Sequence, residues 1–256
     1  MEYEIRQSGK FKYVEEGNGE PLLLLHGLFG ALSNFKDLVD GFKNKYRVII
    51  PLLPLYDLTL IETSVSGLAK YVGKFIEHQK LSDIHLLGNS LGGHIGLVYT
   101  LKHQELIRSI TLTGSSGLFE TGLGDTYPKR GNYDFVKQKT ELTFYDPKVA
   151  TKELVDEVFS IVNNRLNALK IIALARSAIR HNLGDELKEI KIPVCLIWGK
   201  NDTITPPMVA EEFHRLLPTS ELHWIDKCAH APMMEVPEEF NAILSSFLEK
   251  CKKVVL

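Results

Sequence analysis

Cysteine is scarce in this 256-residue sequence, and the three cysteines follow no pattern. Cys195, Cys228 and Cys251 are odd in number, and their spacing is not that of metal ligands. We therefore expect no disulfide framework, no metal site and a reducing compartment. Cys195 lies within an apolar run and is expected to behave as a small hydrophobic residue of the core.

An excess of charge of one sign is also missing. Thirty basic and 32 acidic residues leave a formal net charge of −2, which excludes the electrostatic footprint of a nucleic-acid-binding protein. No apolar run approaches the roughly 20 residues that span a bilayer. Residues 1–5 lack the basic and apolar regions of a signal peptide. We expect a cytoplasmic protein that binds neither membrane nor nucleic acid, and nothing in the sequence indicates its oligomeric state.

The sequence is rich in apolar segments, at 44% hydrophobic residues, and these segments alternate between strand and helix patterns. A chain of this length can bury one substantial core. Residues 3–16 predict an antiparallel hairpin. Further strands are expected at 21–26, 46–50, 84–87, 107–113, 194–198 and 222–225, and helices at 33–42 (capped by Ser33), 63–78, 91–103 and 237–250. This alternation predicts an α/β fold with a mainly parallel sheet covered by helices on both faces.

The alternation stops between residues 115 and 187, where no apolar strand is found. A glycine-rich stretch at 117–131 is followed by predicted helices at 133–139, 151–162 and 165–180. A helical insertion beyond the carboxyl end of a strand is best placed as a lid over a site. We therefore predict a core formed by residues 1–114 and 188–256, with residues 115–187 as its lid.

A serine lies at a sharp turn between the strand at 84–87 and the helix at 91–103. The sequence around it is Gly88-Asn89-Ser90-Leu91-Gly92-Gly93. In this context the G-x-S-x-G pattern predicts a nucleophile elbow, whose strained turn requires small residues two positions before and after the serine. Such a turn raises the Ser90 hydroxyl above the sheet edge. It also aims the backbone N–H of Leu91 at the oxyanion of an acyl-transfer reaction.

Two further residues follow later strands and can complete a catalytic triad with Ser90. Asp202 comes just after the strand at 194–198, and His230 follows the strand at 222–225. The order Ser, Asp, His along the chain is that of the α/β-hydrolases and differs from the orders of chymotrypsin and subtilisin. Taken singly, Asp202 is equally a turn aspartate and His230 a loop histidine. The coincidence of all three at strand ends favours the triad.

These motifs resemble those of the α/β-hydrolase superfamily over nearly the whole chain. The segment His26-Gly27-Leu28-Phe29-Gly30 matches the family's HG-x-x-G loop, and Trp198-Gly199-x-x-Asp202 matches another family pattern. The resemblance implies an eight-stranded sheet, with the lid inserted after the sixth strand. It also implies that the backbone N–H of Leu28, rather than that of Phe29, is the second oxyanion donor. No cofactor is needed for this chemistry.

Within the superfamily, the motifs resemble those of two different groups of enzymes. Asn89 and the run Gly114-Ser115-Ser116-Gly117 resemble carbon–carbon bond hydrolases of aromatic ring-cleavage pathways, but those enzymes usually carry an aromatic residue where Ala231 stands. The oxyanion loop followed by Asn34 instead resembles small bacterial esterases. The leading hypothesis is a serine hydrolase of a small ester. The alternatives are a carbon–carbon bond hydrolase and a non-catalytic ligand-binding relative.

Substrate contacts are expected from the lid and from Phe29. Arg165 occupies the place of a cap arginine in the carbon–carbon bond hydrolases, where it would meet a substrate carboxylate, or else it is a solvated helix residue. We expect His26 to be structural, His94 to be either a helix-surface or a packing residue, and Lys200 and Glu235 to face solvent. The lid aromatics either bind substrate or pack the lid onto the core; they are Phe119, Tyr127, Tyr133, Phe135, Phe144, Tyr145 and Phe159. The segment 51–56 departs from the family's D-x-x-G-x-G-like stretch, so its conformation cannot be inferred.

Overall fold

The fold is built on a single eight-stranded sheet. The computed structural model describes residues 3–29, 32–119 and 131–252. The strand order is β1-β2-β4-β3-β5-β6-β7-β8. Strand β2 pairs antiparallel with β1 and β4, and all other pairs are parallel, as predicted. The bounds are β1 Arg6–Ser8, β2 Phe11–Glu16, β3 Glu20–Leu25, β4 Tyr46–Pro51, β5 Ile84–Asn89, β6 Ile107–Thr113, β7 Val194–Gly199 and β8 Ser220–Ile225.

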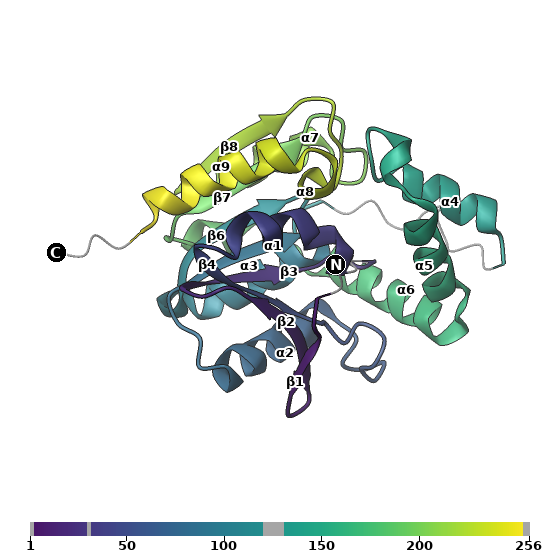
Figure 1. Ribbon diagram of the computed structural model, residues 1–256, viewed down its shortest axis with the longest axis horizontal. Helices are drawn as coiled ribbons and strands as arrows, with labels where there is room; N and C mark the ends of the chain where they lie inside the picture. The colour runs from purple at the N-terminus through teal and green to yellow at the C-terminus, as the bar shows by residue number, and fades with distance from the viewer. Residues whose placement is uncertain (1–2, 30–31, 120–130, 253–256) are drawn as a thin grey trace.

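Helices cover both faces of this sheet (Figure 1). One face carries α1 (Lys36–Phe42), α8 (Pro232–Glu235) and α9 (Pro237–Lys250), and the other carries α2 (Val65–His78), α3 (Leu91–Lys102) and α7 (Pro207–Leu216). Strand β3 shows why two layers are needed. Leu22 and Leu24 pack into one apolar cluster, whereas Leu23 and Leu25 pack into the other, since neighbouring side chains of a strand point to opposite faces. A strand that is apolar on both faces must be buried on both.

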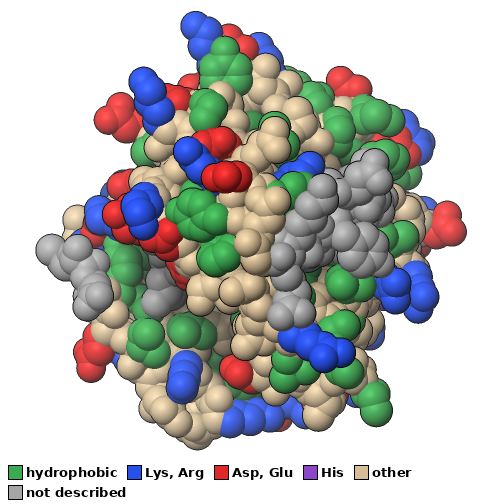
Figure 2. Space-filling view, turned by 90° about the vertical axis from the view of Figure 1, so that its right-hand side faces the viewer, with side chains coloured by type: hydrophobic (Ala, Val, Ile, Leu, Met, Phe, Trp, Pro, Cys, Tyr) green, Lys and Arg blue, Asp and Glu red, His purple; other side chains and the backbone are tan. Residues whose placement is uncertain are grey.

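Among the described residues between β6 and β7, the α-helices lie at one side of the molecule (Figure 1): α4 (Tyr133–Glu141), α5 (Lys152–Asn163) and α6 (Arg165–Arg180). The Asn164 side chain caps α6 by accepting bonds from Leu166 N and Asn167 N, and the chain bends by 92° there. No single helix of the described ranges is long and apolar enough to span a membrane, and α5 and α6 meet that test only as a bent pair. The face seen in Figure 2 carries exposed apolar side chains among charged ones.

Two local predictions differ from the structure. Ser33 was expected to cap a helix, but residues Leu32–Phe35 form a 3-10 turn and α1 begins only at Lys36. Helix α2 begins at Val65 rather than at residue 63, because the Ser64 hydroxyl accepts a hydrogen bond from Gly67 N and so caps the helix. Most of the glycine-rich stretch at 117–131 lies outside the described residues.

Candidate active site

The turn at Ser90 has the strained geometry of a nucleophile elbow. Strand β5 ends at Asn89, α3 begins at Leu91, and Ser90 between them has φ +54° and ψ −122°. A residue other than glycine rarely adopts this backbone conformation, so contacts with the surrounding structure must impose it. Ser90 N donates to the Thr113 carbonyl at 3.1 Å, and the Ser90 carbonyl accepts from Gly93 N at 3.0 Å and Ser116 N at 3.2 Å. The elbow is therefore held between β6 and the start of α3.

The glycines on either side of Ser90 are required by close backbone contacts. A Cβ atom on Gly88 would lie 2.5 Å from the Gly93 backbone, and one on Gly92 would lie 2.0 Å from the Leu25 carbonyl oxygen. Neither atom can be accommodated without moving backbone. The close packing of β3, β5 and α3 is therefore the reason why the motif requires small residues at these two positions.

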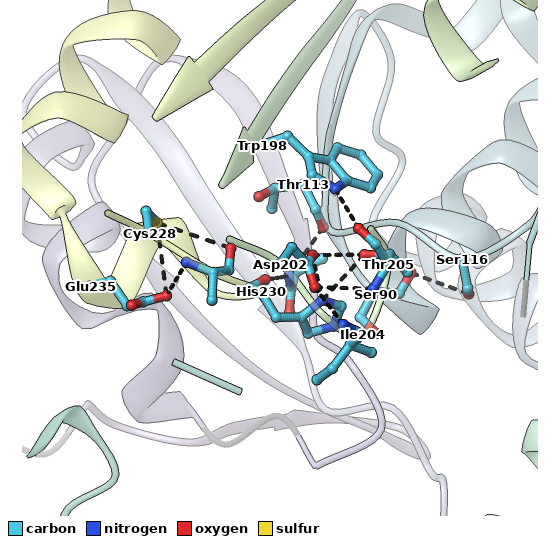
Figure 3. A network of polar contacts seen from close by, with 12 residues as sticks. Ser90, Thr113, Ser116, Trp198, Asp202, Ile204, Thr205, Cys228, His230 and Glu235 are labelled. Carbon is cyan, nitrogen blue, oxygen red and sulfur yellow. Dashed lines mark hydrogen bonds and ion pairs between the residues drawn. The ribbon is translucent and has the colours of Figure 1, made fainter. Parts of the chain in front are cut away.

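Asp202 and His230 form a buried hydrogen-bonded pair (Figure 3). His230 Nδ1 lies 2.9 Å from Asp202 Oδ2. The carboxylate also accepts bonds from Ile204 N at 2.8 Å, Thr205 N at 3.0 Å and the Thr205 hydroxyl at 2.8 Å. Burial would raise the pKa of the Asp202 carboxyl, but His230 and the Thr205 donors together hold that pKa below its ordinary value. Asp202 is therefore ionised at neutral pH and can orient the imidazole.

Ser90 and His230 line the same cavity of about 520 Å³. The Asn89 side chain ties the two together, because its Nδ2 donates to the Thr113 carbonyl at 3.0 Å and to the His230 carbonyl at 3.1 Å. The Ser90 hydroxyl and His230 Nε2 have no hydrogen bond to each other or to any other described residue. In unliganded enzymes the bond between nucleophile and base is often long and tightens on substrate binding.

Two backbone amides beside Ser90 are available as oxyanion donors. Leu91 N is the first amide of α3 and has no intrahelical acceptor. Neither Leu91 N nor Leu28 N donates a hydrogen bond to any described residue. Gly27 brings the Leu28 loop close to the nucleophile, since a Cβ atom on Gly27 would lie 3.2 Å from Ser90 Cβ. The oxyanion roles of both amides stay a prediction.

The segment 51–56 positions the oxyanion loop. Leu53 N donates to His26 Nε2 at 3.2 Å, while His26 Nδ1 lies 2.9 Å from the Gly27 carbonyl oxygen. The Tyr56 hydroxyl donates to the Leu28 carbonyl at 2.8 Å. His26 is therefore structural, as predicted. The loop that departs from the family pattern holds Leu28 in place.

Gly114 adjoins the imidazole and supports a quantitative prediction. Gly114 has φ +51°, and a Cβ atom there would lie 2.8 Å from His230 Nδ1. We expect Gly114→Ala to lower the free energy of unfolding by about 1–2 kcal/mol through backbone strain. We also expect it to lower kcat by up to about a hundredfold, by displacing His230. Thermal denaturation and steady-state kinetics would measure both effects.

The control for that variant is Gly131→Ala. Gly131 has φ +76° but has no atom within 4 Å of its Cβ position, so it carries the strain without the contact. We expect a smaller loss of stability and unchanged kinetics in Gly131→Ala, because a Cβ atom on Gly114 would also lie 2.8 Å from the His230 carbonyl oxygen. Unchanged kinetics in Gly114→Ala would contradict the assigned position of His230.

Some of the residues predicted to contact substrate line the cavity, and others lie at the surface. Phe29, Phe135 and Phe144 line the cavity. Arg165, the first residue of α6, is exposed and is not among the lining residues, which agrees with a solvated residue rather than a carboxylate contact. Of the other aromatics, Tyr133 and Phe159 pack on each other at 5.2 Å, Phe119 and Tyr145 are exposed, and Tyr127 lies outside the described residues.

The prediction that Lys200 and Glu235 face solvent is right for the first residue and wrong for the second. Lys200 is exposed and lies 3.8 Å from Asp226, as a solvent-facing residue should. Glu235 is not solvent-facing as predicted: it is half-buried and accepts bonds from Ala229 N at 2.8 Å and Tyr145 N at 2.6 Å. Burial raises the pKa of its carboxyl. The reason is non-local, because the loop before His230 and the segment after α4 converge on this carboxylate.

His94 is a packing residue, one of the two roles predicted for it. It is fully buried in α3, and its Nε2 lies 3.3 Å from His181 Nδ1. Burial and the neighbouring His181 lower the pKa of His94 to about 3. The side chain is therefore neutral at physiological pH and takes no part in the cavity.

Sequence reasoning missed three supports of the site. The Thr205 hydroxyl donates to Asp202 beside an Asx turn, in which Ile204 N, two residues after Asp202, donates to the same carboxylate. The Thr143 carbonyl accepts from His230 N at 3.0 Å, and Lys139 lines the cavity. Both lie on or just after α4, and no local pattern connects that helix to His230.

One group among the described residues has metal-ligand chemistry. Cys195, Glu221 and His223 bring potential ligand atoms within 4.8 Å of one another on β7 and β8. Glu221 already pairs with the Lys250 ammonium at 2.8 Å and lies 3.0 Å from His223. The carboxylate is thus neutralised by a protein cation. None of the three residues lines the cavity that contains Ser90.

With this geometry in hand, known proteins provide an independent comparison. A family model described as the alpha/beta hydrolase fold matches residues 20–136. Lipase 1 of Psychrobacter immobilis is 30% identical over 92% of this chain and 79% of its own. The chain belongs to the α/β-hydrolase family. A solved α/β-hydrolase enzyme from the sediment metagenome of the Mar Chica lagoon, Morocco, is 44% identical to this α/β-hydrolase, with a TM-score of 0.79 over 96% of this chain and 98% of that one.

Relatives with different named activities match this α/β-hydrolase about equally well. The 2-hydroxy-6-oxo-6-(2'-aminophenyl)hexa-2,4-dienoic acid hydrolase of Metapseudomonas resinovorans is 27% identical over 93% of this chain and 87% of its own. Lipases and carbon–carbon bond hydrolases share hydrolysis, and the comparisons therefore support a hydrolase. They also confirm the predicted α/β-hydrolase fold.

Proposed function

We propose that this protein is a serine hydrolase that cleaves small esters through an acyl-enzyme on Ser90. One observation carries the proposal: the strained Ser90 lines the same cavity as His230, whose imidazole is paired with Asp202. A strained backbone and a buried, oriented imidazole both cost free energy, and a passive binding pocket requires neither. The proposal is also supported by the relatives that match most of the chain, because lipases are among them.

In the proposed mechanism, Ser90 Oγ attacks the ester carbonyl while His230 Nε2 takes its proton. Asp202 fixes the tautomer by accepting from Nδ1 and stabilises the imidazolium that forms. The proton then passes from His230 to the departing alcohol. A water molecule, deprotonated by the same imidazole, releases the acid and restores the Ser90 hydroxyl.

The negative charge of each tetrahedral intermediate would be held by the Leu28 and Leu91 amides. Both are unpaired among the described residues, so they can donate to the oxyanion without first breaking a protein hydrogen bond. Losing one such donor typically costs on the order of 3 kcal/mol of transition-state stabilisation. Because Tyr56 holds the Leu28 carbonyl, the donor is positioned before substrate arrives.

The helical segment that contains α4, α5 and α6 is proposed to act as the lid. The cavity that contains Ser90 is also lined by Val136 and Thr140 of α4, Val158 of α5 and Ile171 of α6. The lid would therefore determine which acyl groups fit. Its mostly apolar lining suits a hydrophobic acyl chain of modest length.

Acyl-chain preference tests the assigned substrate class. With p-nitrophenyl esters of graded length, we expect the highest kcat/KM for acyl chains of about two to six carbons, because the proposed lid, whose described helices are α4, α5 and α6, is modest in size. A preference for long chains would instead indicate a lipase. Absence of hydrolysis for every ester would remove the esterase proposal.

Labelling with a fluorophosphonate separates catalysis from binding alone. The probe phosphorylates a serine only when a base activates the hydroxyl, so rapid labelling of Ser90 is expected. A non-catalytic relative would leave Ser90 unlabelled. Mass spectrometry of the labelled peptide would identify the residue.

A carbon–carbon bond hydrolase is the second candidate, favoured by the 27% identical relative from Metapseudomonas resinovorans. The run Gly114 to Gly117 that suggested this class bonds to the elbow rather than lining the cavity, since the Ser115 hydroxyl donates to the Ser116 carbonyl and Ser116 N to the Ser90 carbonyl. Turnover of a ring-cleavage dienoate faster than of any ester would select this candidate.

A further inference from the structure

The cavity that contains Ser90 has one fixed positive charge. Among the described residues that line it, Lys139 is the only lysine or arginine, and no aspartate or glutamate is present. Most of the other lining side chains are apolar, among them Phe29, Phe135 and Val158. A substrate group beside Lys139 therefore meets a cation that no protein carboxylate in the described lining neutralises.

Lys139 differs in this respect from the lysine two positions before it. Lys137 is exposed and lies 3.7 Å from Glu141, outside the cavity. Lys139 is half-buried, forms no ion pair with a described residue, and its Nζ lies 5.6 Å from the centre of the Phe135 ring. Lysine side chains usually keep the ammonium group in water or next to a carboxylate. The helix thus turns one lysine to a surface partner and the other towards the cavity.

The position of α4 brings this cation near the reacting atoms. His230 N donates to the Thr143 carbonyl at 3.0 Å, so the end of the helix is anchored to the catalytic histidine loop. Helix α4 ends at Glu141, two residues before Thr143, and Lys139 therefore lies in its last turn. Lys139 and Ser90 line the same cavity of about 520 Å³, so one short substrate can place a carboxylate beside Lys139 and its ester carbonyl at Ser90.

We infer that Lys139 binds a carboxylate on the substrate, so that the preferred ester is an anion, such as a half-ester of a short dicarboxylic acid. This inference rests on the proposed esterase function and names its substrate class. A lysine–carboxylate contact in a partly dehydrated cavity is a charge-assisted hydrogen bond. It is made in the ground state and the transition state alike, so it should lower KM more than it raises kcat.

The test compares charged esters with neutral esters of the same shape. Methyl hydrogen adipate and its terminal carboxamide place the charge on the acyl side, and 4-acetoxybutanoate and its carboxamide place it on the alcohol side. Acid release would be titrated for the wild type, Lys139→Met, Lys139→Arg and the control Lys137→Met, which makes the same change in net charge on the outer surface. We expect the wild type to prefer one anionic ester over its carboxamide by about tenfold in kcat/KM.

In Lys139→Met that preference is expected to disappear through a higher KM, with neutral-ester kinetics unchanged. Lys139→Arg should retain most of the preference, and Lys137→Met should retain all of it. Equal losses for charged and neutral esters, the same loss in Lys137→Met, or no preference in the wild type in either pair would overturn the inference. Neutral esters cleaved by the wild type but not by Ser90→Ala would leave the esterase function standing. Failure on all esters would instead reject that function.

Discussion

Replacing Ser90 with alanine is expected to lower kcat for ester hydrolysis by on the order of 10⁶-fold. Without the hydroxyl no acyl-enzyme can form, and the remaining oxyanion donors and binding contacts give only slow hydrolysis by water. The fold should remain intact, because the elbow is held by Ser90 backbone groups and not by the side chain. Ser90 has φ +54°, and its backbone strain should be largely unchanged in the variant, because alanine lacks only the hydroxyl and keeps the Cβ atom.

Steady-state kinetics of the purified variant, with circular dichroism to verify folding, would check this result. Ser115→Ala is a suitable control, because Ser115 is also a buried serine and its hydroxyl donates only to the neighbouring Ser116 carbonyl among the described residues. That control should keep activity close to the wild-type value. Full activity in Ser90→Ala would eliminate the mechanism.

Asp202→Asn is expected to lower kcat by about 10⁴-fold while leaving the structure in place. The amide oxygen of the asparagine can still accept from Ile204 N and Thr205 N, as the carboxylate oxygen Oδ1 does in the wild type. The amide NH₂ would point at His230 Nδ1, where a carboxylate oxygen now accepts at 2.9 Å. The imidazole would then carry its proton on Nε2, where it cannot accept the proton of Ser90.

The matched control is Asp226→Asn, which removes an exposed carboxylate just after the next strand, β8. Its ion pair with Lys200 spans 3.8 Å at the surface, and such pairs contribute little to stability. Kinetics close to the wild-type values are expected for this control. An Asp202→Asn enzyme that lost activity only to the extent of Asp226→Asn would show that the carboxylate does not orient His230.

Much of the fold could be predicted because its signals are local. Each buried strand is an apolar run, and the elbow glycines are required by contacts within a few residues of Ser90 or with the adjacent strand β3. The proposed triad was expected from chain order, because parallel strands bring their carboxyl ends to one edge of the sheet. Errors arose at the starts of helices: a 3-10 turn precedes α1 where Ser33 was expected to cap it, and α2 begins only after its cap Ser64.

Other features depended on contacts between distant segments. Glu235 was expected in solvent, yet it accepts bonds from Ala229 N and Tyr145 N, the latter 90 residues away in the chain. The loop at 51–56 had no family pattern to follow, and its role appears only in the bonds from Leu53 N to His26 and from the Tyr56 hydroxyl to Leu28. Arg165 and Lys139 are both basic residues of the helical insertion, and only their positions in space distinguish surface from cavity.

The sequence by itself determined the α/β-hydrolase sheet, the sharp turn at Ser90 and the strand-end positions of Asp202 and His230, since apolar periodicity, turn chemistry and strand-end position act over short stretches of chain. Only the tertiary structure decided which face of α4 meets the cavity and what holds the oxyanion loop. A helix can present either side to a cavity at little local cost. The choice is made by contacts such as that between Thr143 and His230, which join residues far apart in the chain.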